Sequence, residues 1–112
     1  MRYGREYSPR MGSVRALEAH DVARRLVSLP NWSSHNGRLQ REFKFSTFEQ
    51  AFGFMTSVAL VAQRMDHHPE FTNVYNRVSL TLWTHDVGGL SELDFQLAGA
   101  ADRLAAEFAN TP

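Results

Sequence analysis

Three of the five histidines in this 112-residue chain, His67, His68 and His85, fall in one short stretch of the sequence. Histidine is the side chain whose unperturbed pKa lies nearest neutral pH, so clustered imidazoles indicate proton transfer or metal binding. Asp66 and Asp86 stand next to two of these histidines and could favour one protonation state or one tautomer of the ring. The alternative is that each imidazole is an isolated surface or core residue, and the spacing alone leaves both interpretations open.

Proton transfer fits this cluster better than metal binding. An acid–base pair needs two titratable groups on either side of one small substrate, and His67-His68 on a bend and His85 at a strand end meet that need. Adjacent histidines rarely chelate one ion, and the sequence has neither cysteine nor a His-Glu-x-x-His motif, so we expect no metal. The sequence also lacks Gly-x-Ser-x-Gly and a glycine-rich phosphate loop, so a serine nucleophile and a nucleotide site have no support.

Composition narrows the classes of partner. The formal net charge is zero and the sequence pI is about 7.0, so there is no basic surplus for nucleic acid or an anionic membrane, and we expect neither. No apolar run approaches the roughly 18 residues of a membrane helix. No apolar stretch follows the N-terminal arginines, so we expect no signal peptide. The absence of cysteine fits a cytoplasmic protein. We expect a flexible extension over residues 1–13 and a single domain over residues 14–112.

Helix-breaking residues, turn residues and the spacing of apolar residues predict the elements in the first half of the domain. A helix over residues 16–28 ends before Pro30. Residues 36–37, Asn-Gly, suit a type I′ turn and predict a hairpin whose second strand is residues 38–45. Residues 46–49, Ser-Thr-Phe-Glu, have the form of a capping box, so a helix begins there and runs to about residue 65. The apolar stripe expected to face the core is Phe48, Phe52, Met55, Ala59 and Ala62.

The second half carries the strand that leads to His85. Pro69 disfavours helical geometry at His68, which places the histidine pair on a bend. Residues 74–83 alternate and predict one strand, whose core face is Val74, Val78, Leu80 and Leu82. Tyr75 and Trp83 then lie on the opposite face, where large exposed aromatics predict a homo-oligomer.

The last helix is predicted to run from residue 91 to about residue 108. Its inward residues are Leu93, Leu97, Ala101, Leu104 and Phe108. Asp94 is the last residue of a Ser-x-x-Asp capping pattern, so capping is favoured over catalysis for this carboxylate. The order α-β-β-α-β-α predicts a two-layer α+β domain, an antiparallel β-sheet with three helices packed on one face.

Four segments of the chain together closely resemble the pterin-4a-carbinolamine dehydratase family. They are Ala51-Phe52-Gly53-Phe54-Met55-Thr56, Asp66-His67-His68-Pro69-Glu70, Asn73-Val74-Tyr75-Asn76-Arg77-Val78 and Thr84-His85-Asp86-Val87-Gly88-Gly89-Leu90-Ser91-Glu92. Each segment alone is weakly specific, whereas their common order and spacing are highly specific.

The resemblance implies an activity and an assembly. The family dehydrates 4a-hydroxytetrahydropterin (pterin-4a-carbinolamine) to quinonoid dihydropterin and water, in the recycling of the tetrahydrobiopterin used by aromatic amino acid hydroxylases. It needs no metal or organic cofactor. A hydro-lyase of this family would take a pterin as its small-molecule substrate and act as a homo-oligomer, a dimer or a tetramer. The family's fold, helices on one face of an antiparallel sheet, agrees with the order of elements above.

The resemblance also implies site residues. The family's three active-site histidines match His67, His68 and His85. The positions matching its pterin-contacting residues are Pro69, Thr84, Asp86 and Val87, with Asp94 as a supporting acid. Our hypothesis for the histidines is that His67 and His85 are acids and that His68 is the base or orients the pterin.

Two departures from the family pattern leave other interpretations open. Gln63 stands where family members carry an acid, and Phe71-Thr72 replaces a pair of aromatics. One alternative is a transcription-cofactor-like dimerisation protein, as in some animal relatives, but nothing in the sequence supports it. Another is a non-catalytic paralogue that binds pterin or supports molybdopterin metabolism. The complete set of three histidines argues against the second alternative.

Overall fold

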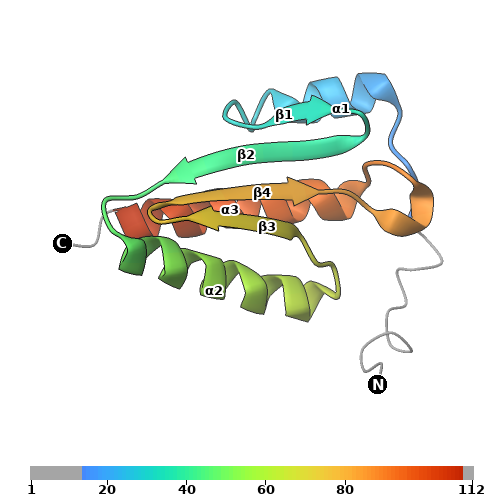
Figure 1. The fold of residues 1–112 in the computed structure, drawn as a ribbon. Coiled ribbons are helices and arrows are strands. Elements are labelled where there is room, and N and C mark those ends of the chain that lie inside the picture. Colours follow the sequence, from blue (N-terminus) through green and yellow to red (C-terminus); the bar gives the residue numbers. More distant parts are fainter. Residues whose placement is uncertain (1–13, 110–112) are drawn as a thin grey trace.

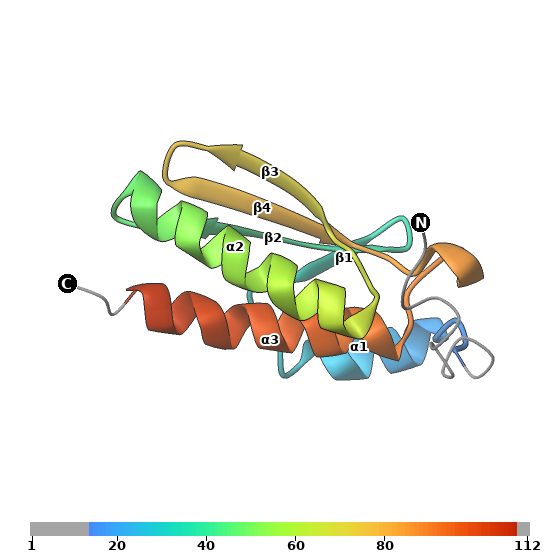
Figure 2. The ribbon, with the colours of Figure 1, turned by 90° about the horizontal axis from the view of Figure 1, so that it is seen from below.

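The computed structural model describes residues 14–109, so the predicted extension over residues 1–13 lies outside the described residues. The elements are α1 (Ala19–Leu26), β1 (Ser33–His35), β2 (Arg38–Lys44), α2 (Phe48–Met65), β3 (Glu70–Val74), β4 (Arg77–Leu82), the short 3₁₀ helix η3 (His85–Val87) and α3 (Glu92–Ala109). The strands form one antiparallel sheet in the order β1-β2-β4-β3. The helices lie on one side of the sheet, with α2 and α3 antiparallel and side by side (Figures 1 and 2). The predicted two-layer α+β class is therefore confirmed.

The first hairpin forms as its turn residues predict. Asn36 and Gly37 have φ angles of 53° and 73°, as a type I′ turn requires, and they join β1 to β2. Along β2, Leu39 and Phe43 are buried while Gln40 and Glu42 are exposed, so the strand presents one apolar face to the helices. Helix α1 is shorter than the predicted range of residues 16–28.

The predicted single strand over residues 74–83 is wrong, because this stretch turns back on itself. β3 and β4 form a second hairpin around Tyr75 and Asn76, and Tyr75 adopts a φ of 50°. The Asn73 amide donates to the carbonyl oxygens of Tyr75 and Arg77 at 3.1 and 2.8 Å. The Asn76 amide donates to the carbonyl oxygen of Phe45 at 2.7 Å. Asparagine side chains thus stabilise this turn. The alternation of apolar residues continues through the turn, so the pattern gave no sign of it.

Helix α2 begins one residue later than predicted and buries a different stripe. Thr47 is its N-cap and accepts from the Gln50 N–H at 3.1 Å, so the cap is Thr47 and not Ser46. The buried residues of α2 are Ala51, Phe54, Val58 and Ala62. Of the predicted stripe only Ala62 is buried, whereas Phe48 and Phe52 are 45% and 53% exposed. The helix has apolar residues on more than one face, so spacing alone selected the wrong one.

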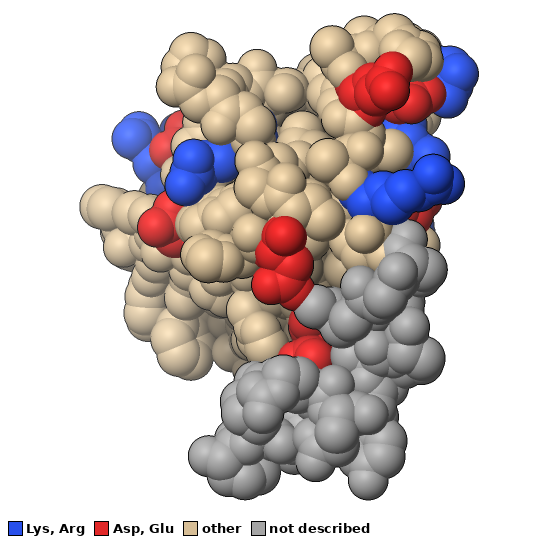
Figure 3. Space-filling model, turned by 90° about the vertical axis from the view of Figure 1, so that its right-hand side faces the viewer, with Lys and Arg blue, Asp and Glu red and all other residues tan. Residues whose placement is uncertain are grey.

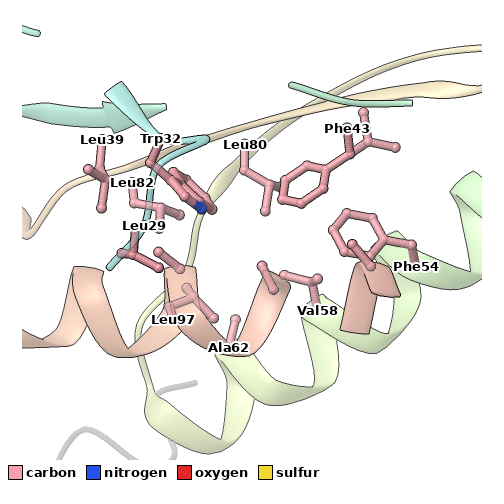
Figure 4. Packing of buried hydrophobic residues seen from close by; sticks show 14 of the residues in the cluster. Leu29, Trp32, Leu39, Phe43, Phe54, Val58, Ala62, Leu80, Leu82 and Leu97 are labelled. Atoms are coloured by element: carbon pink, nitrogen blue, oxygen red, sulfur yellow. The ribbon is translucent and has the colours of Figure 1, made fainter. Parts of the chain in front are cut away.

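The core lies between the sheet and the α2–α3 pair (Figure 4). Leu39, Phe43, Leu80 and Leu82 of the sheet meet Phe54 and Val58 of α2 and Leu97 of α3. The Phe43 and Phe54 rings are 4.6 Å apart. Along α3, Leu93, Leu97 and Ala101 are buried as predicted, while Leu104 and Phe108 are only half-buried. Because the two long helices are antiparallel, this packing holds the end of α2 beside the start of α3.

Candidate active site

The predicted site residues come from four chain segments that meet at one end of the molecule. These are the end of α2, the residues before β3, the turn after β4 and the start of α3, all at the right-hand end in Figure 1. Figure 3 faces this end: residues without a formal charge cover most of it, Asp or Glu side chains lie near its middle, and Lys and Arg lie toward its margins. The fold therefore gathers residues that are far apart in the sequence.

The end of α2 turns the chain so that the two adjacent histidines diverge. Asp66 caps the helix in the left-handed conformation, with a φ of 52°. The Asp66 N–H donates to the Gln63 carbonyl at 3.1 Å, and the His67 N–H donates to the Ala62 carbonyl at 3.0 Å. This pair of bonds is a Schellman motif, which satisfies the last carbonyls of the helix. Aspartate tolerates the left-handed region better than most residues other than glycine, so Asp66 sets the bend that precedes Pro69.

His67 turns inward and binds the carboxylate of Asp94. Its Nε2 lies 2.6 Å from Oδ1 of Asp94, which is 27 residues farther along the chain. His67 is 8% exposed and Asp94 is fully buried. The carboxylate bound to His67 is thus supplied by α3. A buried carboxylate that holds one ring nitrogen fixes the orientation and tautomer of an imidazole, as catalytic and metal-binding histidines require.

Asp94 also caps α3, as its Ser-x-x-Asp pattern predicted. Its Oδ2 accepts from the Ser91 N–H at 2.9 Å, the reciprocal bond of a capping box. The hydroxyl of Ser91 accepts from the Leu93 N–H at 3.2 Å. The Thr84 hydroxyl donates to the same Oδ2 at 2.7 Å and lies 2.6 Å from the Ser91 hydroxyl. One buried carboxylate therefore joins the end of α2, the turn after β4 and the start of α3.

The second ring nitrogen of His67 remains open. Nδ1 has no hydrogen-bond partner among the described residues, and within that part of the chain Arg25 Nε is the only buried side-chain N or O atom left unpaired. Nδ1 is not among these enclosed atoms, so it reaches solvent at least in part. A ring with Nε2 on a carboxylate and Nδ1 open can exchange a proton with a small molecule at Nδ1.

His68 turns the other way and is exposed. Its Nε2 lies 2.9 Å from Oε1 of Gln63, one turn back along α2. An amide oxygen can only accept, so His68 donates from Nε2 and its Nδ1 is the free nitrogen. Gln63, which breaks the expected pattern of an acid at this position, therefore contacts the predicted catalytic pair. Pro69 follows, half-buried, immediately before β3.

The remaining predicted residues lie in the turn after β4. His85, Asp86 and Val87 form η3, directly after Thr84, and the Val87 N–H donates to the Thr84 carbonyl at 3.1 Å. His85 and Asp86 are exposed and Val87 is half-buried. The Thr84 N–H donates to the Gly89 carbonyl at 2.8 Å, which closes the turn. His85 is thus one residue from the Asp94 network without belonging to it.

The network contains one residue that the sequence analysis did not place in the site. Ser91 was expected only to cap α3, and its Ser-x-x-Asp pattern was the available signal. The described residues contain no group of three or more His, Cys, Asp or Glu side chains that could hold a metal ion. None of the described helices is long and apolar enough to cross a membrane.

Comparison with protein families and curated relatives gives a consistent result. Residues 15–104 match the model of the family described as pterin 4 alpha carbinolamine dehydratase. A protein of Solibacter usitatus, provisionally named pterin-4-alpha-carbinolamine dehydratase, is 57% identical over 90 residues, 80% of this chain and 95% of the relative. A relative of the same provisional name from Burkholderia vietnamiensis is 50% identical over 95 residues, 83% of this chain and 93% of the relative.

Two solved structures resemble this fold. The crystal structure of a transcriptional coactivator/pterin dehydratase from Brucella melitensis matches with a TM-score of 0.79 and 40% identity, over 80% of this chain and 98% of that one. A pterin dehydratase-like protein, identified as a RuBisCO assembly factor in the alpha-carboxysome, matches with a TM-score of 0.57 and 23% identity, over 66% of this chain and 86% of that one. At that identity the second likeness shows the fold alone.

Proposed function

Because this chain belongs to the pterin 4 alpha carbinolamine dehydratase family, we propose that it dehydrates a 4a-hydroxytetrahydropterin to a quinonoid dihydropterin and water. The observation that carries the proposal is the buried pair of His67 and Asp94, with Nδ1 of the histidine open to solvent. The same end of the molecule holds His68 and His85. We place the reaction in tetrahydrobiopterin recycling in the cytoplasm, with support from the family and from the cysteine-free sequence.

The reaction requires two proton transfers. The bond between C4a and oxygen breaks, the oxygen takes a proton and leaves as water, and a ring nitrogen of the pterin loses a proton. We assign His67 and His85 as the candidate acids and His68 as the base or as the residue that orients the pterin. Each assisted transfer contributes on the order of 10²–10⁴-fold. The chemistry is complete with protein side chains and needs neither a metal nor an organic cofactor.

The structure suggests different duties for the proposed substrate-binding residues. Pro69, Asp86 and Val87 flank the histidines and are accessible enough to contact a pterin. Thr84 is only 5% exposed, and its hydroxyl is bound to Asp94 and Ser91. We therefore propose that Thr84 and Asp94 support His67 from behind, while Pro69, Asp86 and Val87 touch the substrate.

The test is an absorbance assay in which the 4a-hydroxypterin is generated in situ by a hydroxylase. We expect this protein to accelerate dehydration, and to do so equally after treatment with EDTA. Activity abolished by EDTA and restored by zinc would contradict the metal-free mechanism. Pterin binding without any acceleration would favour the alternative of a non-catalytic pterin-binding or dimerisation protein.

We also propose that the protein is a homo-oligomer, a dimer or a tetramer. The support is a set of exposed apolar residues at the end of the molecule away from the histidines. Phe48 and Phe52 pack ring to ring at 5.7 Å on the outer face of α2, and Val74 and Tyr75 are 66% and 64% exposed at the β3–β4 turn. Trp83, which was expected to be exposed with Tyr75 on the sheet face opposite the core, is instead half-buried under the Arg38 guanidinium at 4.2 Å.

Light scattering behind size exclusion at micromolar concentration tests this assembly. A mass that is a multiple of 12.7 kDa is expected. Phe52→Glu should lower that mass by placing a charge in the apolar surface. A monomer for the unmodified protein would contradict the proposal.

A further inference from the structure

Two buried hydroxyl groups lie behind His67 and take no direct part in the proposed reaction. They belong to Thr84 and Ser91, which are 5% and 1% exposed. We propose that these hydroxyls are positioning groups that fix the tautomer of His67, so that Nε2 donates to Asp94 and Nδ1 is the nitrogen that exchanges protons. The inference rests on the proposed function for the identity of the substrate, and on the hydrogen-bond geometry for everything else.

The direction of each hydrogen bond in this network follows from the available protons. The N–H groups of Leu93 and Ser91 can only donate, the first to the Ser91 hydroxyl and the second to Oδ2 of Asp94. The Thr84 hydroxyl gives its single proton to the same Oδ2. The contact between the two hydroxyls therefore uses the Ser91 proton, and Thr84 accepts it. All of these hydrogen bonds therefore donate in one direction, from Ser91 to Thr84 and from Thr84 to Asp94.

The direction of these hydrogen bonds determines which oxygen of Asp94 faces His67 and whether that oxygen carries a proton. Oδ2 of Asp94 accepts two hydrogen bonds, at 2.7 and 2.9 Å, so a proton on Asp94 would have to sit on Oδ1. Two donors on Oδ2 compensate the negative charge of the buried carboxylate and leave Oδ1 as an acceptor. Oδ1 is 2.6 Å from Nε2 of His67, so the proton between them belongs to the ring. The lone pair or the transferable proton is then at Nδ1.

Removing a hydroxyl should reverse this arrangement. Without the Thr84 hydroxyl, Oδ2 would keep a single donor, and the buried charge would be less well compensated. In the protonated ring, the form in which His67 would act as an acid, the proton between Oδ1 and Nε2 would move toward Oδ1 and leave a neutral ring that carries its proton at Nδ1. A neutral ring gives up its Nδ1 proton much less readily than an imidazolium does, so His67 would be a weaker acid toward the substrate.

Nuclear magnetic resonance of the ring nitrogens tests the proposal without any substrate. Thr84→Val removes the hydroxyl at nearly constant volume, and Thr84→Ser restores it. Thr56→Val is the matched control, since the Thr56 hydroxyl bonds only the Phe52 carbonyl of its own helix. His67→Asn assigns the signal. We expect His67 to be the Nε2–H tautomer in the unmodified protein, in T84S and in T56V. In T84V the ratio of the Nδ1–H to the Nε2–H tautomer should rise several-fold, up to about tenfold. An unchanged tautomer in folded T84V would overturn the proposal.

Kinetics supply a second and independent readout. Because neither hydroxyl reaches the substrate, T84V should lower kcat about tenfold with KM nearly constant, and T84S should restore it. Ser91→Gly removes the other hydroxyl while keeping a residue that helix N-caps tolerate, so kcat should fall without much loss of stability. Ser91→Thr should restore kcat. An effect on KM alone would make Thr84 a substrate contact and overturn the inference. If the unmodified protein lacked dehydratase activity, the proposed function would fail, while the ring-nitrogen measurement would still decide the tautomer.

Discussion

Two carboxylates of α3, Asp94 and Asp102, bind different kinds of partner. They are eight residues apart, or about 12 Å along the helix. Asp94 binds His67, the Thr84 hydroxyl and the Ser91 N–H. Asp102 accepts from Trp32 Nε1 at 2.8 Å and from Arg41 at 2.5 Å, both on one oxygen. Both carboxylates connect α3 to distant segments, so hydrogen bonding alone does not distinguish a catalytic carboxylate from a structural one.

What distinguishes them is the chemistry of the partner. Arginine stays charged at any physiological pH and the indole N–H does not titrate, so the Asp102 contacts hold one fixed protonation state. Asp94 instead binds an imidazole, the type of side chain that most often serves as a general acid or base. Burial differs as well, because the Asp94 side chain is fully enclosed while that of Asp102 is 26% exposed beside a surface hollow of about 340 Å³. If the proposed function holds, the start of α3 supports the chemistry, and the middle of α3 links it to the sheet and to the segment that carries Trp32.

The sharpest test of this assignment substitutes each carboxylate by its amide. Asp94→Asn should lower kcat by about 10²-fold or more, because an amide that donates toward Nε2 would force the other tautomer on His67. Asp102→Asn should leave kcat unchanged. Steady-state kinetics on both variants, corrected for the folded fraction, measure this difference. Equal losses of kcat would mean that both carboxylates act through stability.

The histidines allow a second comparison, between a buried and an exposed imidazole. His67→Ala and His85→Ala should each lower kcat by 10²–10⁴-fold if both are acids. Only His67→Ala should also lower stability, by about 1–3 kcal/mol, because it leaves Oδ1 of the buried Asp94 without a partner. Urea unfolding beside kinetics separates the two effects. A loss of Tm with unchanged kcat in the folded fraction would make His67 structural.

The structural carboxylate should be measurable through stability alone. Asp102→Asn should cost about 1–2 kcal/mol, since it removes the charge from hydrogen bonds to buried Trp32 and half-buried Arg41. Trp32→Phe removes a single neutral donor and should cost about 1 kcal/mol. In the double variant these losses should not add, because both residues belong to one contact. Additive losses would show that Trp32 and Asp102 stabilise the fold independently.

The sequence predicted locally determined features better than those that depend on long-range contacts. Asn36-Gly37 predicted its hairpin because both positions accept positive φ, a local property of those residue types. The β3–β4 turn was missed because its stabilising contacts include one from Asn76 to Phe45, 31 residues away. The contact between His67 and Asp94 was not predicted either, because it depends on how α2 packs against α3. The sequence could indicate histidines suited to proton transfer and a carboxylate that caps α3, but not that this carboxylate also binds His67.

The smallest expected effect lies at the far end of the helix pair, where Gly53 of α2 faces Phe108 of α3. A Cβ added at Gly53 would sit 2.6 Å from Cε1 of Phe108, too close for any real contact. Phe108 is half-buried in the last turn of α3, so its ring can move aside at modest cost. Alanine is favoured over glycine inside a helix by up to about 1 kcal/mol, which offsets part of the clash.

Gly53→Ala should therefore destabilise the protein by about 0.5–1 kcal/mol, with kcat unchanged. Phe108→Ala is destabilising by itself, but in that background Gly53→Ala should become stabilising, since the clash is gone and the helix propensity remains. Urea unfolding of the four proteins in this cycle gives the coupling directly. If Gly53→Ala stabilised the unmodified protein, the Phe108 ring would not pack on Gly53 in solution. If instead it lowered kcat, the far half of α3 would not be separate from the chemistry at Asp94.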